Sequence, residues 1–411
     1  MQCSGIKVAV IGGSITGCTA AIELSRIGCD VTLYERSGEE LKERGAGIGV
    51  PPSVIEAYVD RQLIGADVPY FNARNFVRRW RTSDEPRFGR LAWEQPTSLV
   101  LLNWGMLYRN LRERVPAGVY RTGHRVIGLD LAADHVTLTL AGHGLHAFDL
   151  VVCADGYASL GRRTLFPEVD VGYAGYVLWR GVLPEAALAE SAPLESGIHA
   201  LGYPGGHGVF YLVPGPDGST QRGARLVNWG MYVPVADLAA FMVDREGRPH
   251  EGSLPPGAMP HATERELKAA ALARLPGFYS DIVAATQGTY VYAIYDCEVP
   301  AYRRGRLCLA GDAGAFARPH TGAGALKGVT DAIALSTALT SQPDMETALR
   351  EWNVTQTEHG NRMVRFGNQL GRALVQEIPD WSAMSASEME RWFTSIVTVD
   401  NEVFEANRRR A

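Results

Sequence analysis

A glycine-rich turn, followed by Glu35, stands out in the first 35 residues of the chain. The turn consists of Gly12, Gly13, Ser14, Ile15, Thr16 and Gly17. Glycines allow a tight turn close to a pyrophosphate, and a helix that begins there offers free N–H groups to the phosphates. Ser14 replaces the usual second glycine, and its small side chain can cap the helix. Glu35 can bond both ribose hydroxyls of an adenosine. The turn and Glu35 together therefore predict a site for FAD or NAD.

Two more acidic residues follow apolar runs that are typical of buried strands. Asp155 comes after residues 150–153, and Asp312 comes after residues 306–310. Each can bond polyol hydroxyls at a sheet edge. A second glycine-rich helix start, whose N–H groups can stabilise developing negative charge, follows Asp312. It consists of Gly322, Ala323, Gly324 and Ala325. Coincidence is a poor explanation of three motifs in this order, and an NAD-dependent dehydrogenase, which would use the first motif alone, leaves the other two unexplained.

The residues around these motifs predict alternating strands and helices. Residues 6–11 and 31–34 are apolar runs typical of parallel strands, and residues 15–27 have apolar side chains at helical spacing. Short strands with Gly and Pro turns over residues 172–233 predict a separate, mostly antiparallel sheet. Helices dominate from residue 323 onward. Other expected elements are helices at 52–63, 104–115 and 262–275, strands at 74–81 and 288–298, a meander at 125–131, 135–140 and 145–153, and a surface loop at 236–262.

The predicted fold class is α/β, with more than one domain because 411 residues exceed the usual size of a single core. We expect a Rossmann-like, three-layer FAD-binding domain with an inserted substrate domain built on a mostly antiparallel sheet. A C-terminal helical region would pack on the flavin domain or form a homodimer contact. The predicted boundaries are 1–72, 97–171 and 299–343 for the FAD-binding domain, 73–96 and 172–298 for the substrate domain, and 344–411 for the helical region.

The composition argues against several classes of partner. The net charge is −5, and the only dense basic run is residues 408–410, so we expect no nucleic acid. No apolar window approaches the ~18 residues of a membrane span, and no signal peptide is evident, so we expect no membrane partner. The six cysteines form no CxxC pair and the ten histidines form no HExxH. We therefore expect no metal and a reducing, cytoplasmic location.

The three motifs together resemble those of the para-hydroxybenzoate-hydroxylase-type flavoprotein monooxygenases, over nearly the whole chain. The resemblance implies that residues 12–17 turn around the FAD pyrophosphate and that Glu35 holds the adenosine ribose. Asp312 would bind the ribityl chain, and the helix start at 322–325 would face the flavin pyrimidine edge. Further implied cofactor residues are Arg36, Arg44 near the phosphate–ribityl region, Val126, and Asp155 where FAD and NAD(P)H chemistry meet.

Within that family, residues 12–15, 173–183 and 318–332 are most similar to members that hydroxylate a pyridine ring. This implies a small, electron-rich aromatic or heteroaromatic substrate, such as a hydroxypyridine or a phenol. The resemblance also implies that NADH or NADPH reduces the flavin and that O₂ then forms a C4a-hydroperoxide, which the substrate ring attacks. The cofactor supplies the difficult chemistry, and the protein supplies placement, dryness and proton control.

Four residues are candidates for substrate contact or proton control. A hydroxylated ring is most nucleophilic when it is deprotonated, so His320 beside the second helix start is the first candidate base, unless it only shapes its turn. Tyr211 on a predicted strand, His207 at a predicted hairpin tip and Arg180 are the others; Arg180 can hold an anionic substrate or the nicotinamide cofactor. Their plainer alternatives are core packing, a turn and a structural salt bridge. Three aromatic residues could wall the pocket or belong to the core: Trp179, Trp229 and Tyr232.

Other functions remain open at this point. The same flavin chemistry serves Baeyer–Villiger oxidation or epoxidation of a larger natural product. A halogenase is disfavoured because no Trp-x-Trp pair is present. A non-catalytic FAD-binding module is the alternative of another class. Oxygen uptake that a substrate stimulates would exclude that module.

Overall fold

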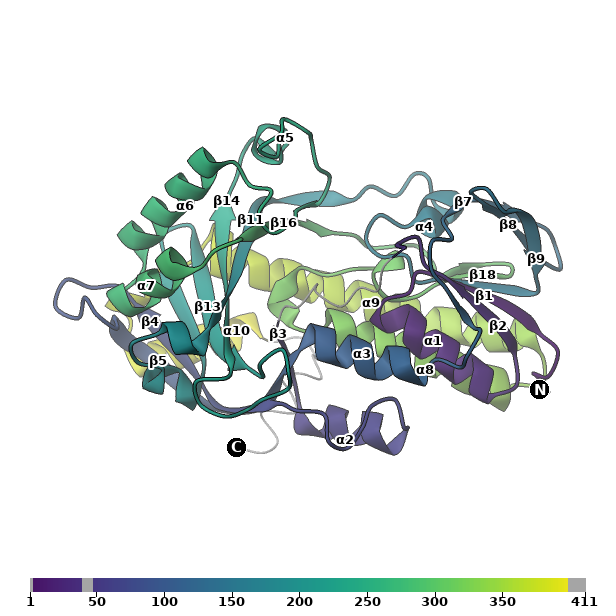
Figure 1. Ribbon diagram of the computed structural model, residues 1–411, viewed down its shortest axis with the longest axis horizontal. Helices are drawn as coiled ribbons and strands as arrows, with labels where there is room; N and C mark the ends of the chain where they lie inside the picture. Colours follow the sequence, from purple (N-terminus) through teal and green to yellow (C-terminus); the bar gives the residue numbers. More distant parts are fainter. Residues whose placement is uncertain (1–2, 39–46, 398–411) are drawn as a thin grey trace.

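The computed structural model describes residues 3–38 and 47–397 and is built on three sheets. Figure 1 shows a nine-stranded sheet at the left of the molecule and a six-stranded sheet at the right. A small three-stranded sheet lies beyond the six-stranded one. This arrangement confirms the predicted α/β class with a Rossmann-like domain, a mostly antiparallel second sheet and C-terminal helices.

The six-stranded sheet forms the middle layer of the predicted three-layer unit. Val8 and Val10 of its first strand pack with helices, whereas Ala9 and Ile11 pack with the three-stranded sheet, because successive strand residues point to opposite faces. Its order is β17 (Arg303–Arg304), β18 (Leu307–Leu309), β10 (Leu150–Cys153), β1 (Lys7–Ile11), β2 (Asp30–Tyr34) and β6 (Tyr120–Arg121). All pairs are parallel except β17–β18.

Helices cover one face of this sheet and the meander covers the other. Helices α1 (Ile15–Arg26) and α8 (Gly324–Ser341) pack against each other and on the sheet, and both begin at its strand ends. The opposite layer is the antiparallel sheet of β7 (Val126–Leu131), β8 (Val136–Leu140) and β9 (Gly144–Phe148). The predicted third run, 145–153, is divided between β9, which completes the meander, and β10, which returns the chain to the six-stranded sheet.

The nine-stranded sheet is antiparallel except where β12 pairs with β4. One face is covered by α6 (His261–Arg274) and α7 (Gly277–Ala285). The strand order is β15 (Ser253–Leu254), β16 (Tyr290–Asp296), β11 (Gly172–Pro184), β14 (Leu226–Pro234), β13 (Gly206–Val213), β12 (Gly197–Tyr203), β4 (Phe71–Trp80), β5 (Arg90–Asn103) and β3 (Gly47–Val50).

Strand β5 is the largest element that the sequence pattern did not reveal. It contains Pro96, which normally argues against a strand because proline cannot donate to the ladder. The structure accommodates Pro96 opposite Asn75, next to a register shift in the pairing of β5 with β4. The shift leaves the missing N–H beside an irregularity, where it interrupts the ladder least. The helix α7 was also not predicted, and the short β15 and α5 (Leu238–Phe241) lie within the expected surface loop.

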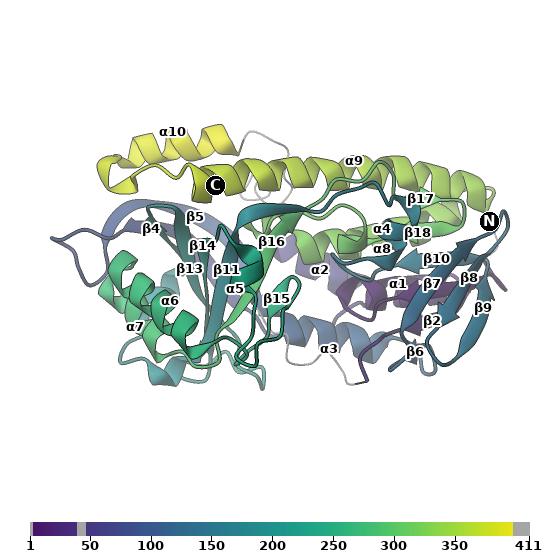
Figure 2. The same ribbon diagram turned by 90° about the horizontal axis from the view of Figure 1, so that it is seen from above.

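A long C-terminal helix joins the two halves of the molecule. Helix α9 (Met345–Gly371) has 27 residues, and Figure 2 shows it extending alongside both large sheets. A π-helical turn (Arg372–Gln376) follows, and α10 (Ala386–Ile396) then lies over β5. The predicted helix at 344–372 is confirmed; of the one at 384–408, residues after 397 lie outside the described part. The remaining helices are α2 (Pro52–Asp60), α3 (Trp104–Arg114) and α4 (Leu160–Leu165).

Candidate active site

One face of the nine-stranded sheet forms the floor of a cavity of about 720 Å³. Alternate residues of each strand reach it, as the two-residue repeat of a strand requires. The central strands contribute Leu178 and Arg180 from β11, Asn228, Gly230 and Tyr232 from β14, and His207, Val209 and Tyr211 from β13. All four predicted catalytic residues, His320, His207, Tyr211 and Arg180, line this cavity.

The same alternation corrects the predicted aromatic wall. Trp179 lies between Leu178 and Arg180, so it points away from the cavity. Trp179 and Trp229 are fully buried in the core beneath α6 and α7, with ring centroids 5.0 Å apart. Only Tyr232 of the three aromatic candidates lines the cavity. The period of two in β11 was the signal that could have shown this, since Trp179 and Arg180 are neighbours.

His320 lies in the short turn Pro319–Thr321 that precedes α8. Its Nε2 is 2.9 Å from the Tyr176 hydroxyl, and its ring lies 4.1 Å from that of Tyr232. Its buried Nδ1 has no partner among the described residues. Burial, aided by His207 and Arg318, holds the His320 pKa well below its usual range. The imidazole is therefore neutral at pH 7 and has one nitrogen that only a bound molecule or a water can pair with.

A chain of hydrogen bonds leads from His320 away from the cavity. Arg318 Nη1 donates to the Tyr176 hydroxyl at 3.5 Å, and Arg318 Nε donates to Asp296 at 2.7 Å. Burial raises the pKa of Tyr176 to about 12, so the phenol stays protonated. The Arg318 and Asp296 side chains are 12% and 17% exposed. The chain thus joins the candidate base to groups that water can reach.

Tyr211 and His207 already have partners within the protein. The Tyr211 hydroxyl donates to the Gly47 carbonyl at 2.9 Å, and the Gly47 N–H donates to Asn228 at the same distance. Arg180 also reaches Asn228, at 3.3 Å. His207 lies within β13 rather than at the hairpin tip, which is Gly205, and its Nδ1 bonds the Leu374 carbonyl at 3.1 Å. Positioning roles therefore suit Tyr211 and His207 better than proton transfer.

The first glycine-rich turn is shaped by its own packing. Gly12 has φ +99°, and a Cβ there would lie 2.4 Å from the Ala154 carbonyl oxygen. A Cβ at Gly17 would lie 1.8 Å from the Gly12 carbonyl oxygen, so both positions require glycine. Ser14 occupies the N-cap of α1, but its side chain makes no cap hydrogen bond, so that part of the prediction is wrong. The uncapped N–H groups of α1 remain available to a ligand.

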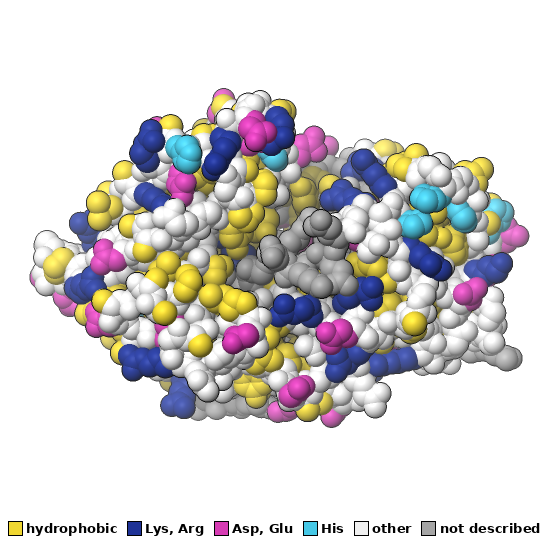
Figure 3. All heavy atoms as spheres, in the orientation of Figure 1, with side chains coloured by type: hydrophobic (Ala, Val, Ile, Leu, Met, Phe, Trp, Pro, Cys, Tyr) yellow, Lys and Arg dark blue, Asp and Glu magenta, His cyan; other side chains and the backbone are white. Residues whose placement is uncertain are grey.

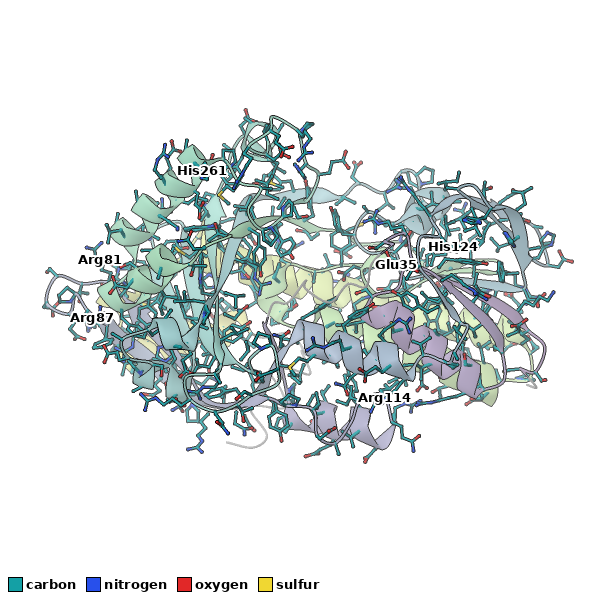
Figure 4. The ribbon with its side chains drawn as sticks, in the orientation of Figure 1. Glu35, Arg81, Arg87, Arg114, His124 and His261 are labelled. Atoms are coloured by element: carbon teal, nitrogen blue, oxygen red, sulfur yellow. The ribbon has the colours of Figure 1, made fainter. Side chains whose placement is uncertain are left out.

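Glu35 lies at the end of β2, close to the start of α1 (Figure 4). Its two carboxylate oxygens accept hydrogen bonds of 2.8 Å from the backbone N–H groups of Gly13 and Ser37. The carboxylate is therefore fixed beside the turn that would hold a pyrophosphate. Arg36 is exposed, Val126 is half-buried on β7, and neither lines the cavity, while Arg44 lies outside the described residues.

The second helix start is open in the way that a planar ligand requires. Gly322 has φ +65°, and, chain neighbours apart, no atom of residues 3–38 and 47–397 lies within 4 Å of a Cβ added at Gly322 or Gly324. Helix α8, like α1, lacks a side-chain cap. Asp312 lines the same cavity, and burial raises the pKa of its carboxyl. The acid, the open glycines and the free helix N-terminus fit a flavin and its ribityl chain.

Two family models match the chain: Pyridine nucleotide-disulphide oxidoreductase over residues 7–48 and FAD binding domain-like over residues 173–296. A relative, 2,6-dihydroxypyridine 3-monooxygenase of Paenarthrobacter nicotinovorans, is 29% identical over 89% of this chain and 91% of its own length. 3-amino-4-hydroxybenzoate 2-monooxygenase of Streptomyces platensis is 27% identical over 91% and 89%. The structure of 2,6-dihydroxypyridine-3-hydroxylase from Arthrobacter nicotinovorans matches with TM-score 0.82 and 26% identity, over 92% of this chain and 94% of that one.

The chain is an FAD-dependent monooxygenase, and it is similar to enzymes of the para-hydroxybenzoate-hydroxylase type. The relatives confirm the resemblance, the cofactor and the enzyme class that three short motifs predicted. They favour this class over a dehydrogenase and over a non-catalytic FAD-binding module. As a member of the class, the monooxygenase uses FAD, NADH or NADPH, and O₂.

Arg162, which was not among the predicted site residues, connects two of the predicted motifs of the monooxygenase. Asp155 accepts hydrogen bonds from Ser159 and from the Leu160 N–H, so its side chain starts α4. Arg162 of α4 then donates to the Asp312 and Ala313 carbonyls, both at 3.1 Å, and thereby ties the second motif to the third. Two acidic motifs that each precede a helix could not reveal this cross-link, because it joins residues 150 positions apart.

A buried ion pair supports the same turn from α8. Lys327 donates to Asp331 and to the Gly311 carbonyl, both at 2.8 Å, and Asp331 accepts from the Gly311 N–H at 2.9 Å. The Lys327 and Asp331 side chains are each 1% exposed. The sequence contained a signal for this ion pair, since two opposite charges four residues apart in a mainly apolar helix are neighbours on one face.

A group of histidines lies apart from this site. Histidine side chains gather on the end of the molecule that the three-stranded sheet forms (Figure 3), and His124 stacks on His143 with centroids 4.4 Å apart. Within residues 3–38 and 47–397, no group of three His, Cys, Asp or Glu side chains could hold a metal. Over the same ranges, no helix is long and apolar enough to cross a membrane.

Proposed function

We propose that this monooxygenase hydroxylates a small electron-rich ring that already carries a hydroxyl group, such as a hydroxypyridine or a phenol. The observation that carries the proposal is the meeting of neutral His320, the Tyr232 ring and the open helix start at Gly322 and Gly324 in one cavity. Two relatives are named for a dihydroxypyridine and an aminohydroxybenzoate, which are rings of this kind.

We assign the FAD contacts to residues 12–17, Glu35, Asp312 and the helix start at 322–325. The uncapped N–H groups of α1 and α8 suit a pyrophosphate and the electron-rich edge of a flavin. Arg36, Arg44, Val126 and Asp155 remain cofactor-binding predictions. When bound, FAD supplies the reduction by NAD(P)H and the activation of O₂. The protein excludes water and places the ring, because the cavity is walled by the sheet, by α8 and by the C-terminal helices.

His320 and its neighbours would control the proton of the substrate hydroxyl. The neutral imidazole accepts that proton at Nδ1, and the Nε2 proton is shared with the Tyr176 hydroxyl. Arg318 and Asp296, which are themselves partly exposed, then connect Tyr176 to the solvent. Arg180, held by Asn228, lies on the same floor and stabilises the deprotonated ring, which is an anion.

The test is flavin reduction by NADH or NADPH in the FAD-loaded protein, without oxygen, against a panel of hydroxypyridines and phenols. We expect a true substrate to accelerate reduction by at least about tenfold, and to be hydroxylated when O₂ is admitted. A protein that takes up no FAD, or a panel in which no ring changes the rate, would contradict the proposal. Oxidised flavin that is reduced without substrate control would also count against it.

We further infer a reducing, cytoplasmic location and no nucleic-acid partner. The six cysteines all lie in the described part, and each is a buried thiol that forms no disulfide there, which suits a reducing compartment. The net charge of −5 disfavours nucleic acid. A homodimer remains a prediction, which the mass of the purified protein in solution would decide.

A further inference from the structure

Arg78 is a buried cation in the wall of the active-site cavity. It lies on β4, is 2% exposed, and lines the cavity together with Gln95 of β5. Its Nη1 donates to Gln95 at 3.4 Å, and its other N–H groups have no acceptor among the described residues. No described carboxylate forms an ion pair with it, although Glu390 of α10 lines the same cavity. Burial lowers the pKa of Arg78 to about 9, so the guanidinium is charged at neutral pH.

Three aromatic rings surround the guanidinium of Arg78. Its central carbon lies 4.0 Å from the ring centroid of Phe393, 4.5 Å from that of Phe76 and 4.7 Å from that of Trp93. Ring faces attract a cation but offer no acceptor to its N–H groups. The cage therefore holds the planar group in one orientation and leaves its hydrogen-bonding capacity largely unused. A buried charge with this much unused capacity is costly unless a ligand completes it.

The sheet register places Arg78 across the cavity floor from Arg180. Paired positions run from Arg180 to Gly230, Val209, Ala200 and Arg78, one strand at a time. Four strand spacings correspond to about 19 Å between the two backbones. The three residues in the row between the arginines, Gly230, Val209 and Ala200, carry no long or aromatic side chain. A flat molecule can lie across this part of the floor.

His207 links the Arg78 end of the floor to the candidate base. The Arg78 charge contributes to lowering the His207 pKa, after burial. The His207 ring lies 4.7 Å from that of Tyr232 and 5.4 Å from that of His320. A ring that rests on Tyr232 and His320 therefore has Arg78 as the next charged group along the floor. The cavity, about 720 Å³, also exceeds the roughly 150 Å³ that suffices for benzene, so an added group has room beside the flavin.

We propose that Arg78 binds the carboxylate of an aromatic acid, whose hydroxylated ring lies against Tyr232 and His320. The planar guanidinium matches a carboxylate in a two-point contact, which neither a neutral ring nor a ring hydroxyl provides. The inference rests on the proposed function and narrows its substrate class to hydroxylated aromatic acids. Arg78 is on this view a residue that sets substrate specificity, distinct from the base.

The test compares acids with their amides on the FAD-loaded enzyme. The probes are hydroxybenzoate, hydroxyphenylacetate and hydroxyphenylpropionate, each paired with the corresponding carboxamide, and dissociation constants are read from the flavin absorbance change. We expect at least one acid to bind roughly tenfold or more tightly than its amide. Arg78→Gln should abolish this preference and leave amide binding within about twofold of the original protein.

Arg79→Gln is the matched control. Arg79 is the next residue of β4 and donates to the Gly89 carbonyl at 2.9 Å. Its charge adds to burial in lowering the pKa of His199, which lies on the opposite face of the sheet. Its removal should leave the preference for acids intact. If acids and amides bind the original protein equally, or if Arg78→Gln keeps the preference, the inference is overturned. Loss of the preference in Arg180→Gln alone would assign the carboxylate to Arg180 instead and equally overturn it.

Folding and function are separated by two further measurements. Arg78→Met removes an unpaired buried charge, so its melting temperature should not fall; a clear fall with the acid preference retained would show a structural role and contradict the inference. Amides that accelerate flavin reduction without any preference for acids would leave the proposed function standing and overturn only the role of Arg78. If no probe accelerates reduction while Arg78→Gln still abolishes acid binding, the proposed function fails and the carboxylate site remains.

Discussion

His320 owes its neutral state to burial and to its neighbours His207 and Arg318. A neutral imidazole is ready to accept a proton, whereas an imidazolium would have to lose one first. The hydrogen bond to Tyr176 fixes the His320 ring, so the protonation of Nδ1 depends on the hydrogen bond that Nε2 makes. In the proposed function Tyr176 is a positioning residue, since it would act on the substrate through His320.

His320→Gln should retain FAD and slow hydroxylation by roughly 100-fold or more, because the substrate hydroxyl loses its base. In the original protein the rate should be flat between about pH 6 and 8, since the lowered pKa keeps His320 neutral throughout. Single-turnover hydroxylation across this range is the measurement. Tyr176→Phe, which keeps the ring, should cost less. An acid limb near pH 6.5 that disappears in His320→Gln would show that the pKa of His320 is ordinary.

Glu185 shows how a buried charge can stabilise the fold when it is paired. Its side chain is 1% exposed and bonds Arg225 at 2.6 Å and 2.8 Å. Although burial opposes ionisation, the hydrogen bonds from Arg225 and others lower the Glu185 pKa from 4.5 to about 2. A depressed carboxyl pKa stabilises the fold above the unfolded value, and this contribution is lost as pH falls from 4.5 toward 2.

We therefore expect Glu185→Gln to lower the free energy of unfolding at pH 7 by about 3–5 kcal/mol, as when one partner of a buried pair is removed. The difference from the original protein should shrink below about pH 4.5. Urea unfolding at pH 7 and pH 4 would measure it. Glu195→Gln, whose side chain is 39% exposed, is the control and should cost much less. An equal cost at both pH values would argue against the ionised pair.

At the scale of elements, the starts of α1 and α8 lack side-chain caps, although one begins after a serine. The uncapped N–H groups destabilise the protein while no ligand is bound, and they can donate hydrogen bonds to an anionic ligand. The open space in front of Gly322 and Gly324 shows where such a ligand has room.

Gly324→Asp should stabilise the protein without FAD by about 0.3–1 kcal/mol, since an acid suits the N-terminus of α8. It should also weaken FAD binding by tenfold or more, because the added carboxylate occupies the flavin's space and repels its negative edge. Gly324→Ala is the neutral control, with a similar or larger gain in stability and a smaller loss of affinity. FAD titration and thermal unfolding are the two readouts; unchanged affinity in Gly324→Asp would remove α8 from the site.

The local sequence pattern was sufficient to predict some of the strands and helices but not others. The strands β1, β2 and β10 were predictable because burial on both faces makes them continuous apolar runs. Strand β5 was hidden by Pro96, whose effect depends on a register shift in the pairing of β5 with its partner β4. The cage around Arg78 was hidden for the same reason: Trp93 belongs to β5 and Phe393 to α10, so no short segment contains the arrangement. His320, Tyr211, His207 and Arg180 were identified, yet their partners were not, because each partner is distant in sequence.

At the scale of the whole molecule, α9 connects the two large sheets. With 27 residues it is about 40 Å long, and it packs on α8 in one half and leads into the turn beside β13 in the other. Val354 on this helix is 65% exposed. A break in α9 should therefore affect both halves together.

Val354→Pro should destabilise the protein by about 3 kcal/mol or more, since proline removes a hydrogen bond and bends the helix. We expect both FAD binding and the substrate response to weaken. Val354→Lys, which keeps the helix and the exposure, should change little. Chemical unfolding followed separately by flavin and tryptophan fluorescence would show whether the halves respond together; loss confined to one signal would contradict this coupling.

The π-helical turn after α9 closes the active-site cavity with residues from the far end of the chain. Leu374, Trp381 and Phe393 line the same space as Gly47 and Phe76. A ribosome must therefore deliver the chain at least as far as Phe393 before the chamber is walled. A product that stopped at residue 371 would keep both helix starts to which we assign the FAD contacts and leave the reacting ring open to water. Termination at residue 371 should thus yield a yellow protein that oxidises its nicotinamide without coupling the electrons to substrate.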